Sequence, residues 1–210
     1  MYKKTHISDA VIKRLPKYYR YLCHLLQNGE HKISSKALAE ALNVTASQVR
    51  QDFSNFGEFG QQGYGYDIYK LTMEISQILN LHADYNVIIV GGGNIGNALA
   101  HYTGFKKDGF NIKAMFDINP NNIKTPDKCE ALHVDKLEEY CKDNHVDIAI
   151  IATQKEAAEG IYNRICNIGI RGVWNFVPVD LMSKDNTVVE NINMSDSLFV
   201  LSYYMQNQNK

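Results

Sequence analysis

The segment that most constrains the fold is IIVGGGNIGNALAHY at residues 88–102, an apolar run followed by a glycine cluster and a helix-like stretch. Gly91, Gly93 and Gly96 satisfy the pattern G-x-G-x-x-G between a predicted strand and a predicted helix. In a dinucleotide-binding fold the first glycine permits a tight turn, the second admits the pyrophosphate, and the third allows close helix–strand packing. The helix start presents free N–H groups to phosphate. This context predicts a dinucleotide site.

An acidic residue stands where such a site needs one. A second predicted strand, 112–117, ends at Asp117, 21 residues beyond Gly96. A carboxylate there accepts hydrogen bonds from the adenosine ribose hydroxyls and repels a 2′-phosphate, which favours NAD(H) over NADP(H). The alternative is that the glycines serve only a turn and that Asp117 merely ends a strand.

From residue 85 onward, predicted strands alternate with predicted helices, which is typical of a parallel sheet covered on both faces. The strands are 86–90, 112–117, 146–153 and 171–177, and the helices are 94–108, 134–144 and 155–169. A last helix near 195–208 carries an apolar stripe formed by Leu198, Leu201, Tyr204 and Met205. Such a stripe packs on its own domain or on a partner chain.

The first part of the chain predicts three short helices and a wing. The helices are expected at 7–29, 34–43 and 45–56, followed by a glycine-rich hairpin at 57–66 and a linking helix at 67–81. Thr45 and Gln48 form a capping box for the third helix. The inward faces of the second and third helices are predicted to be Ala37, Leu38, Ala41 and Leu42, and Val49, Phe53 and Phe56.

Residues 1–50 hold nine lysines and arginines against three acidic residues, although the whole chain has a net charge of −1. A basic helix–turn–helix with a wing indicates DNA binding, with the third helix in the major groove. Arg50 can contact guanine and Gln51 adenine, while phosphates can be neutralised by Lys3, Lys4, Lys13, Lys17, Lys32 and Lys36. The alternative is a three-helix bundle used for dimerisation.

We expect no enzymatic activity. The nucleotide fold uses nearly all of residues 85–180, so no substrate domain is available, and no Ser/His/Asp or metal constellation is visible. The four cysteines lack metal-ligand spacing, and neither a signal peptide nor a membrane span is apparent. We therefore expect a cytoplasmic protein without a membrane partner.

The chain resembles the Rex family of redox-sensing transcriptional repressors. The resemblance is carried by RLPKYYRYL, ISSKALAEALNVTASQVRQDFSNFGEFG, GYGY, GGGNIGNALAHYTGF, FDINP and GVWNFVPVDL, spread over residues 14–181. It implies an α/β protein with a winged helix-turn-helix and linking helix at 1–80, a Rossmann NAD(H)-binding domain at 81–192 and a domain-swapped helix at 193–210. It also implies a homodimer that binds a palindromic operator in double-stranded DNA when NADH is scarce. NADH binding would release the dimer from DNA, and NAD⁺ would compete with NADH for the same site.

The resemblance and the motifs together define three sets of predicted site residues. The NAD(H) contacts are Gly91, Gly92, Gly93, Asn94, Ile95, Gly96, Tyr102, Asp117, Thr153, Asn175, Phe176 and Pro178. The DNA contacts are Lys13, Lys17, Ser35, Ala46, Ser47, Gln48, Arg50, Gln51, Ser54 and Gln62. An interdomain switch is expected at Arg20 and Asn193.

Some positions depart from the family pattern. Asn193 stands where relatives carry an aspartate that pairs with Arg20, and Gln154 stands where a proline is usual. Gln51 and Gln62 occupy positions that are often basic. Two other functions stay open: a small NAD-dependent oxidoreductase, and a nucleotide- or CoA-binding regulator whose front domain contacts protein.

Overall fold

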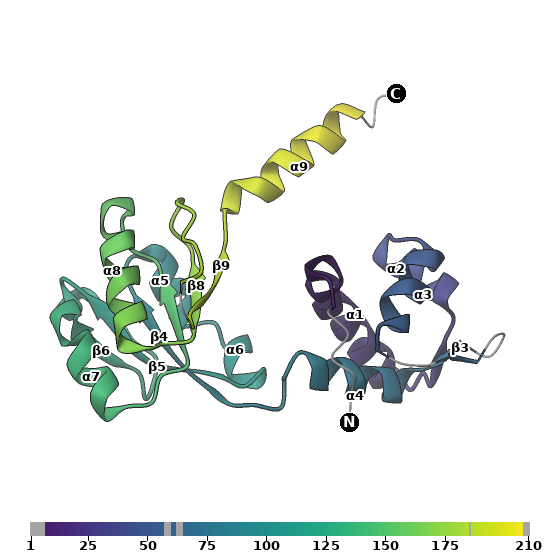
Figure 1. Cartoon of the computed structure of the whole chain (residues 1–210), viewed down its shortest axis with the longest axis horizontal. Helices are drawn as coiled ribbons and strands as arrows, with labels where there is room; N and C mark the ends of the chain where they lie inside the picture. Colours follow the sequence, from purple (N-terminus) through teal and green to yellow (C-terminus); the bar gives the residue numbers. More distant parts are fainter. Residues whose placement is uncertain (1–6, 57–59, 62–64, 185, 208–210) are drawn as a thin grey trace. The chain divides into compact units, whose positions relative to one another are not determined.

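The computed structural model describes residues 7–56, 60–61, 65–184 and 186–207, and the chain divides between Ala83 and Asp84 into two compact units. The first unit contains α1 (Asp9–Gln27), α2 (Ser35–Leu42), α3 (Ala46–Ser54) and α4 (Ile68–Ile78). Its sheet is antiparallel, in the order β1-β3-β2, from β1 (Lys32–Ile33), β2 (Gly60–Gln61) and β3 (Gly65–Asp67). Helix α2, a turn and helix α3 followed by a β-hairpin form a winged helix-turn-helix (Figure 1).

Local capping sets the boundaries of the two short helices. Ser34 Oγ accepts a hydrogen bond from Ala37 N at the start of α2, and Thr45 Oγ1 accepts one from Gln48 N at the start of α3. Between them, Asn43 ends α2 in the left-handed conformation with φ of 54°. The chain thereby reverses direction within three residues and brings α3 back against α2.

The predicted inward faces are partly right. Val49, Phe53 and Phe56 are buried with α1 residues such as Leu15 and Leu22 in the core of the first unit. The prediction for α2 is wrong at Ala37 and Ala41, which are exposed, whereas Leu38 and Ala39 are buried. A helix of two turns buries only a narrow stripe, and in α2 Leu38 and Ala39 form that stripe.

The second unit contains a six-stranded parallel sheet. In chain order its strands are β4 (Tyr85–Val90), β5 (Phe110–Asp117), β6 (Glu130–His133), β7 (Ile148–Ile151), β8 (Gly172–Asn175) and β9 (Val188–Asn191). They lie side by side in the order β6-β5-β4-β7-β8-β9, and every adjacent pair is parallel. With the strands of this sheet renumbered from one, that order is 3-2-1-4-5-6, which defines the Rossmann fold. Strands β6 and β9 were not among the predicted strands.

The predicted helix at 94–108 is two helices, α5 (Asn94–Ala100) and α6 (Gly104–Lys107). The chain breaks at His101, which ends α5, and Tyr102 turns over Gly104, where a Cβ would collide with the tyrosine ring. The prediction of a single long helix was therefore wrong, because the chain leaves the helical path between Ala100 and Gly104.

Helices cover the two faces of the sheet unequally. Helices α7 (Leu137–Asp143) and α8 (Lys155–Ile168) pack on one face, with Ile161 and Ile165 against the strands (Figure 1). On the other face, α5 packs near Ile89 and Met115, and a groove of about 430 Å³ lies over β7, β8 and β9. The terminal helix α9 (Met194–Asn207) buries none of its side chains within the described chain.

Candidate functional site

The glycine loop lies where β4 ends and α5 begins, next to the end of β7. Gly91 has a φ of +110°, and a Cβ there would collide with the carbonyl group of Ala152. A Cβ on Gly96 would collide with the carbonyl oxygen of Gly91. These two glycines are required by the fold itself. Gly93 differs, because a Cβ there would meet no atom within 4 Å, so the loop leaves open space at the position expected to face a pyrophosphate.

Asp117 closes the same loop from the end of β5. Its Oδ2 accepts a hydrogen bond of 2.7 Å from Gly92 N, and its Oδ1 accepts one of 2.8 Å from Asn119 N. Each oxygen keeps a further lone pair for a ribose hydroxyl. Ile123 packs on Gly92, where a Cβ would meet its Cγ1 at 2.6 Å. Ile123 follows a short 3₁₀ turn at Pro120–Asn122 and was not among the predicted site residues.

Three more of the predicted coenzyme residues lie next to the glycine loop. Asn94 and Ile95 are exposed in the first turn of α5. Thr153 follows β7, and its backbone nitrogen lies 2.8 Å from the Cβ position of Gly91. The glycine loop therefore lies at the carboxyl ends of β4 and β7, the point at which the strand order reverses and Rossmann folds bind nucleotides. The expected coenzyme position between this loop, Asp117 and Thr153 is called the coenzyme crevice below.

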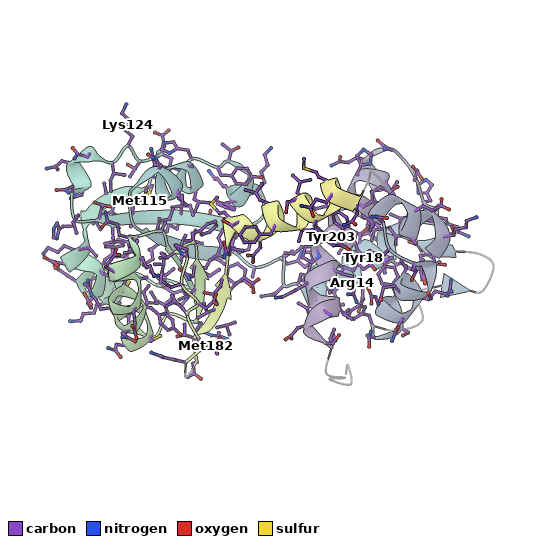
Figure 2. All side chains as sticks on the ribbon, turned by 90° about the horizontal axis from the view of Figure 1, so that it is seen from above. Arg14, Tyr18, Met115, Lys124, Met182 and Tyr203 are labelled. Atoms are coloured by element: carbon purple, nitrogen blue, oxygen red, sulfur yellow. The ribbon has the colours of Figure 1, made fainter. Side chains whose placement is uncertain are left out.

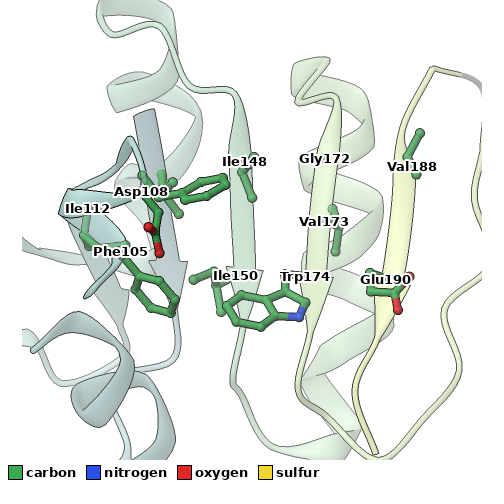
Figure 3. Close-up of a pocket in the computed structure, with 12 residues that line it drawn as sticks. Phe105, Asp108, Ile112, Ile148, Ile150, Gly172, Val173, Trp174, Val188 and Glu190 are labelled. Atoms are coloured by element: carbon green, nitrogen blue, oxygen red, sulfur yellow. The ribbon is translucent and has the colours of Figure 1, made fainter. Parts of the chain in front are cut away.

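Four aromatic rings pack in a row, from Tyr102 after α5 to Phe176 after β8. The centroids of Tyr102 and Phe105 are 4.8 Å apart, those of Phe105 and Trp174 5.7 Å, and those of Trp174 and Phe176 4.6 Å, all in edge-to-face geometry. Tyr102 is 59% exposed. Figure 3 shows Trp174 above the strands, between Ile150 and Glu190. This row provides a rigid apolar wall with one open end at Tyr102.

Asn175, a predicted coenzyme residue, is held by hydrogen bonds within the protein. Its side chain is fully buried, with Nδ2 donating to Val179 O at 2.7 Å and to Asn191 Oδ1 at 2.9 Å, while Oδ1 accepts from Val177 N at 3.0 Å. These bonds engage both ends of the side-chain amide. Phe176 and Pro178 lie on the loop that Asn175 holds, and Pro178 is exposed.

In the first unit, α3 presents a polar exposed face opposite its buried stripe. Ser47, Arg50, Gln51 and Ser54 are exposed, and Arg50 Nη1 donates to Ser35 Oγ at 3.2 Å. Of the other predicted DNA contacts, Ala46 is partly buried against the core, Lys13 and Lys17 are exposed on α1, and Gln62 lies outside the described residues.

Gln48 is held by a buried carboxylate that the sequence analysis missed. Asp52 is fully buried in α3, and its two oxygens accept hydrogen bonds from Arg14 Nε and Nη2 at 2.7 and 2.8 Å, from Tyr18 Oη at 2.9 Å and from Gln48 Nε2 at 2.7 Å. Arg14 and Tyr18 lie one turn apart on α1 (Figure 2). The capping box is consequently half formed, and Gln48 is turned toward Asp52 rather than free for DNA.

The pKa of Asp52 reflects two opposed effects. Burial raises the pKa of this carboxyl, but the hydrogen bonds from Arg14, Gln48 and Tyr18 outweigh burial and hold the pKa below its ordinary value. Asp52 is thus a buried carboxylate that fixes the recognition helix to α1. A sequence signal existed, because Asp52 falls at helical spacing within the stripe of Val49, Phe53 and Phe56.

The two predicted switch residues belong to different units. Arg20 is exposed on α1. Asn193 lies just before α9, and its Oδ1 accepts a hydrogen bond of 3.1 Å from Ser195 N. Asn193 therefore caps the terminal helix.

Among the described residues no group of histidine, cysteine or acidic side chains could hold a metal ion. None of the helices in the described part of the chain is long and apolar enough to cross a bilayer.

The comparisons with known proteins agree with both units. Residues 6–54 match the family profile "Putative DNA-binding protein N-terminus", and residues 82–179 match "CoA binding domain". The chain is 50% identical over 207 residues to the redox-sensing transcriptional repressor Rex of Clostridioides difficile, covering 98% of this chain and 99% of that one.

Two solved structures of a Rex-family repressor superpose closely. The structure of RSP with β-NAD⁺ and operator DNA has a TM-score of 0.88 and 46% identity, covering 98% of this chain and 95% of that one. The structure of RSP with β-NADH also has a TM-score of 0.88, with 43% identity and coverage of 98% and 97%.

Fold and site thus define a transcription regulator that joins a winged helix to a dinucleotide-binding Rossmann unit. The chain belongs to the Rex family of redox-sensing transcriptional repressors. Its relatives are named as repressors rather than as enzymes, in agreement with the expectation that it catalyses no reaction.

Proposed function

We propose that this protein represses transcription by binding operator DNA as a homodimer and that NADH releases it. The observation that carries the proposal is the open position at Gly93 beside Asp117, at the reversal point of a 3-2-1-4-5-6 sheet, in a chain that also holds a winged helix. Operator DNA and NAD(H) meet in the bacterial cytoplasm, where we place the protein.

Asp117 selects NAD(H). Gly92 N and Asn119 N already orient its carboxylate, so its remaining lone pairs face outward at a fixed angle. A negative charge held in this way accepts the ribose hydroxyls and opposes a 2′-phosphate. Gly91, Gly92, Gly93, Asn94, Ile95, Gly96 and Thr153 would form the backbone cradle around the pyrophosphate.

The aromatic row supplies the discrimination between the oxidised and reduced nicotinamide. Tyr102 and Phe176, with Pro178 beside it, would place the ring against an apolar wall. An apolar wall disfavours the cationic ring of NAD⁺ more than the neutral ring of NADH. A ligand shifts a conformational equilibrium only by its difference in affinity for the two states, and a coupling of about 1–3 kcal/mol is typical of allosteric proteins.

Operator recognition belongs to the exposed face of α3. Arg50 suits guanine because its guanidinium presents two parallel donors, and Ser35 holds one of them in place before DNA arrives. Gln51, Ser47, Ser54 and Ala46 would line the groove, with Lys13, Lys17 and Gln62 near phosphates. Gln48 would affect DNA binding only indirectly, because its hydrogen bond to Asp52 helps to hold α3 in place.

The terminal helix is the proposed dimer contact. Its exposed apolar side chains include Leu198, Phe199, Leu201 and Tyr204, each more than half exposed, and such a helix needs a covering surface. The groove lined by Phe105, Ile150 and Trp174 is an apolar surface of the same chain that a second copy would offer (Figure 3). We therefore propose that 193–210 is exchanged between subunits, with the DNA-binding part at 1–80 and the Rossmann part at 81–192.

The proposed switch pairs Arg20 of one subunit with Asn193 of the other. An asparagine brings no charge, and here its Oδ1 is already bonded to Ser195 N. This pair would therefore contribute a hydrogen bond from the charged guanidinium to a neutral amide rather than an ion pair.

The test is a salt-dependent gel shift on promoter fragments, titrated with NADH and with NAD⁺. We expect retardation that weakens with salt and is abolished by NADH at concentrations where NAD⁺ leaves the complex intact. Promoter occupancy that ignores NADH, with both nucleotides binding equally, would overturn the proposal. Turnover of NADH with a substrate would favour an oxidoreductase.

A further inference from the structure

Two asparagines at the carboxyl edge of the sheet form a closed amide pair. Asn175 ends β8 and Asn191 ends β9, and the two are register partners in the parallel ladder. Asn175 Nδ2 donates to Asn191 Oδ1 at 2.9 Å, and Asn175 is fully buried. Asn191 was not among the predicted site residues.

The pair holds the loop at residues 176–181 from both ends. Asn175 bonds Val177 N and Val179 O. Asn191 Oδ1 accepts from Leu181 N at 3.1 Å, and its Nδ2 donates to Leu181 O at 3.0 Å. Asn175 Nδ2 also donates to Val177 O at 3.3 Å. The loop carries Phe176 and Pro178, so its position is set by these five side-chain bonds.

The same pair also holds the start of the terminal helix. Ile192 N donates to Asn175 O at 2.8 Å, and only Ile192 and Asn193 separate β9 from α9. A shift of the loop therefore pulls on Asn191, and a shift of Asn191 changes where α9 leaves the sheet.

We propose that the Asn175–Asn191 pair is the coupling element that transmits occupation of the coenzyme crevice to α9. The inference rests on the proposed function, and both asparagines act as positioning residues. A polar pair suits this task because its hydrogen bonds fix one geometry, whereas apolar packing tolerates several. The hydrogen bonds between these side-chain amides also involve no charged group, so the coupling between coenzyme binding and α9 is insensitive to salt.

The experiment measures reciprocal coupling in the full-length protein. The Kd of NADH is determined by titration with and without a saturating promoter duplex that the wild type retards, and the ratio of the two values is the coupling factor. We expect a factor of roughly 5–150 for the wild type and a fall toward one for Asn191→Leu, with operator affinity in the absence of NADH within about twofold of the wild type.

Thr187→Val is the matched control. Thr187 is buried next to β9, and its Oγ1 donates to Ile170 O at 2.8 Å, away from the loop. The valine variant removes a buried hydrogen bond at the same edge of the sheet. We therefore expect this variant to lower the melting temperature and to keep the wild-type coupling factor. If Thr187→Val lowers the factor as much as Asn191→Leu does, general destabilisation explains both.

Asn191→Ser keeps a polar group and gives a second measurement where the leucine variant does not fold; an intermediate coupling factor is expected. The inference is overturned if Asn191→Ser or Asn191→Leu folds and retains the full wild-type factor. A wild-type factor of one would instead refute the proposed function, which separates the two failures.

Discussion

Replacing Asp52 by asparagine tests whether a buried charge fixes the recognition helix. Each carboxylate oxygen accepts two donors: Oδ2 from Arg14 Nε and Tyr18 Oη, and Oδ1 from Arg14 Nη2 and Gln48 Nε2. An asparagine places an NH₂ group where one oxygen was. Tyr18 Oη or a turned Gln48 amide can accept from that group, but one Arg14 donor loses its acceptor whichever way the asparagine amide turns. Bonds to a charged group contribute about 1.5–3 kcal/mol each, and removing one partner of a buried pair costs about 3–5 kcal/mol.

We therefore expect Asp52→Asn to lower the free energy of unfolding of the first unit by about 3–5 kcal/mol, which is about 12–40 °C in melting temperature for a unit of this size. Far-UV circular dichroism follows both units. The single tryptophan, Trp174, lies in the second unit, so its fluorescence transition should stay where it is.

Two further variants serve as controls for the effect of Asp52→Asn. Glu40→Gln removes the exposed pair with Lys36, whose charged atoms are 4.0 Å apart, and should change nothing measurable. The double change Arg14→Met with Asp52→Leu removes both charges together and should recover most of the loss, because the penalty comes from the unpaired charge. A loss below about 1 kcal/mol for Asp52→Asn would show that the network does not hold the helix.

Four further outcomes follow from the same geometry. Gly93→Val places its side chain in open space, so it should fold normally and retain operator binding while losing the NADH response; loss of both by gel shift would contradict the open site. Arg50→Ala should weaken binding to the specific operator by about 1–3 kcal/mol and leave NADH titrations unchanged, whereas unaltered operator affinity would exclude a base contact. Leu201→Asp should shift the protein from dimer toward monomer in analytical ultracentrifugation, and an intact dimer would remove α9 from the interface. Because the pKa of Asp52 is lowered in the folded state, its stabilisation is complete above the unfolded pKa near 4 and is lost as pH falls through the lower folded value; Asp52→Asn should flatten this acid limb in a pH series of melts.

The sequence predicted the Rossmann unit well because its strands are continuous apolar runs. The apolar run of β4 is sufficient to predict the strand, since Val87, Ile88, Ile89 and Val90 are all buried. Strands β6 and β9 escaped prediction for the opposite reason: each has four residues, and their side chains are exposed or only partly buried. A strand of that length at the edge of a sheet has too few apolar positions to show a period.

Helix faces were predicted less well than helix positions. Apolar spacing assigned Ala37 and Ala41 to the core, although a methyl group has too little area to decide the rotation of a short helix. Asp52 was overlooked because local pattern rules treat a charge as exposed. Its partners Arg14 and Tyr18 lie 38 and 34 residues away on another helix, so the pairing exists only once α1 and α3 pack together.

Asn175 shows why the role of a site residue is harder to predict than its place. The motif GVWNFVP placed this residue at the end of a strand, where the structure has it as the last residue of β8, and an amide there is chemically able to bind a ligand. Whether it binds a ligand or the protein depends on Asn191, 16 residues later, and on the register that sets β9 beside β8. No local window of sequence contains that register, because parallel neighbours are joined by long connections. The buried amide therefore holds the loop that carries Phe176 and Pro178.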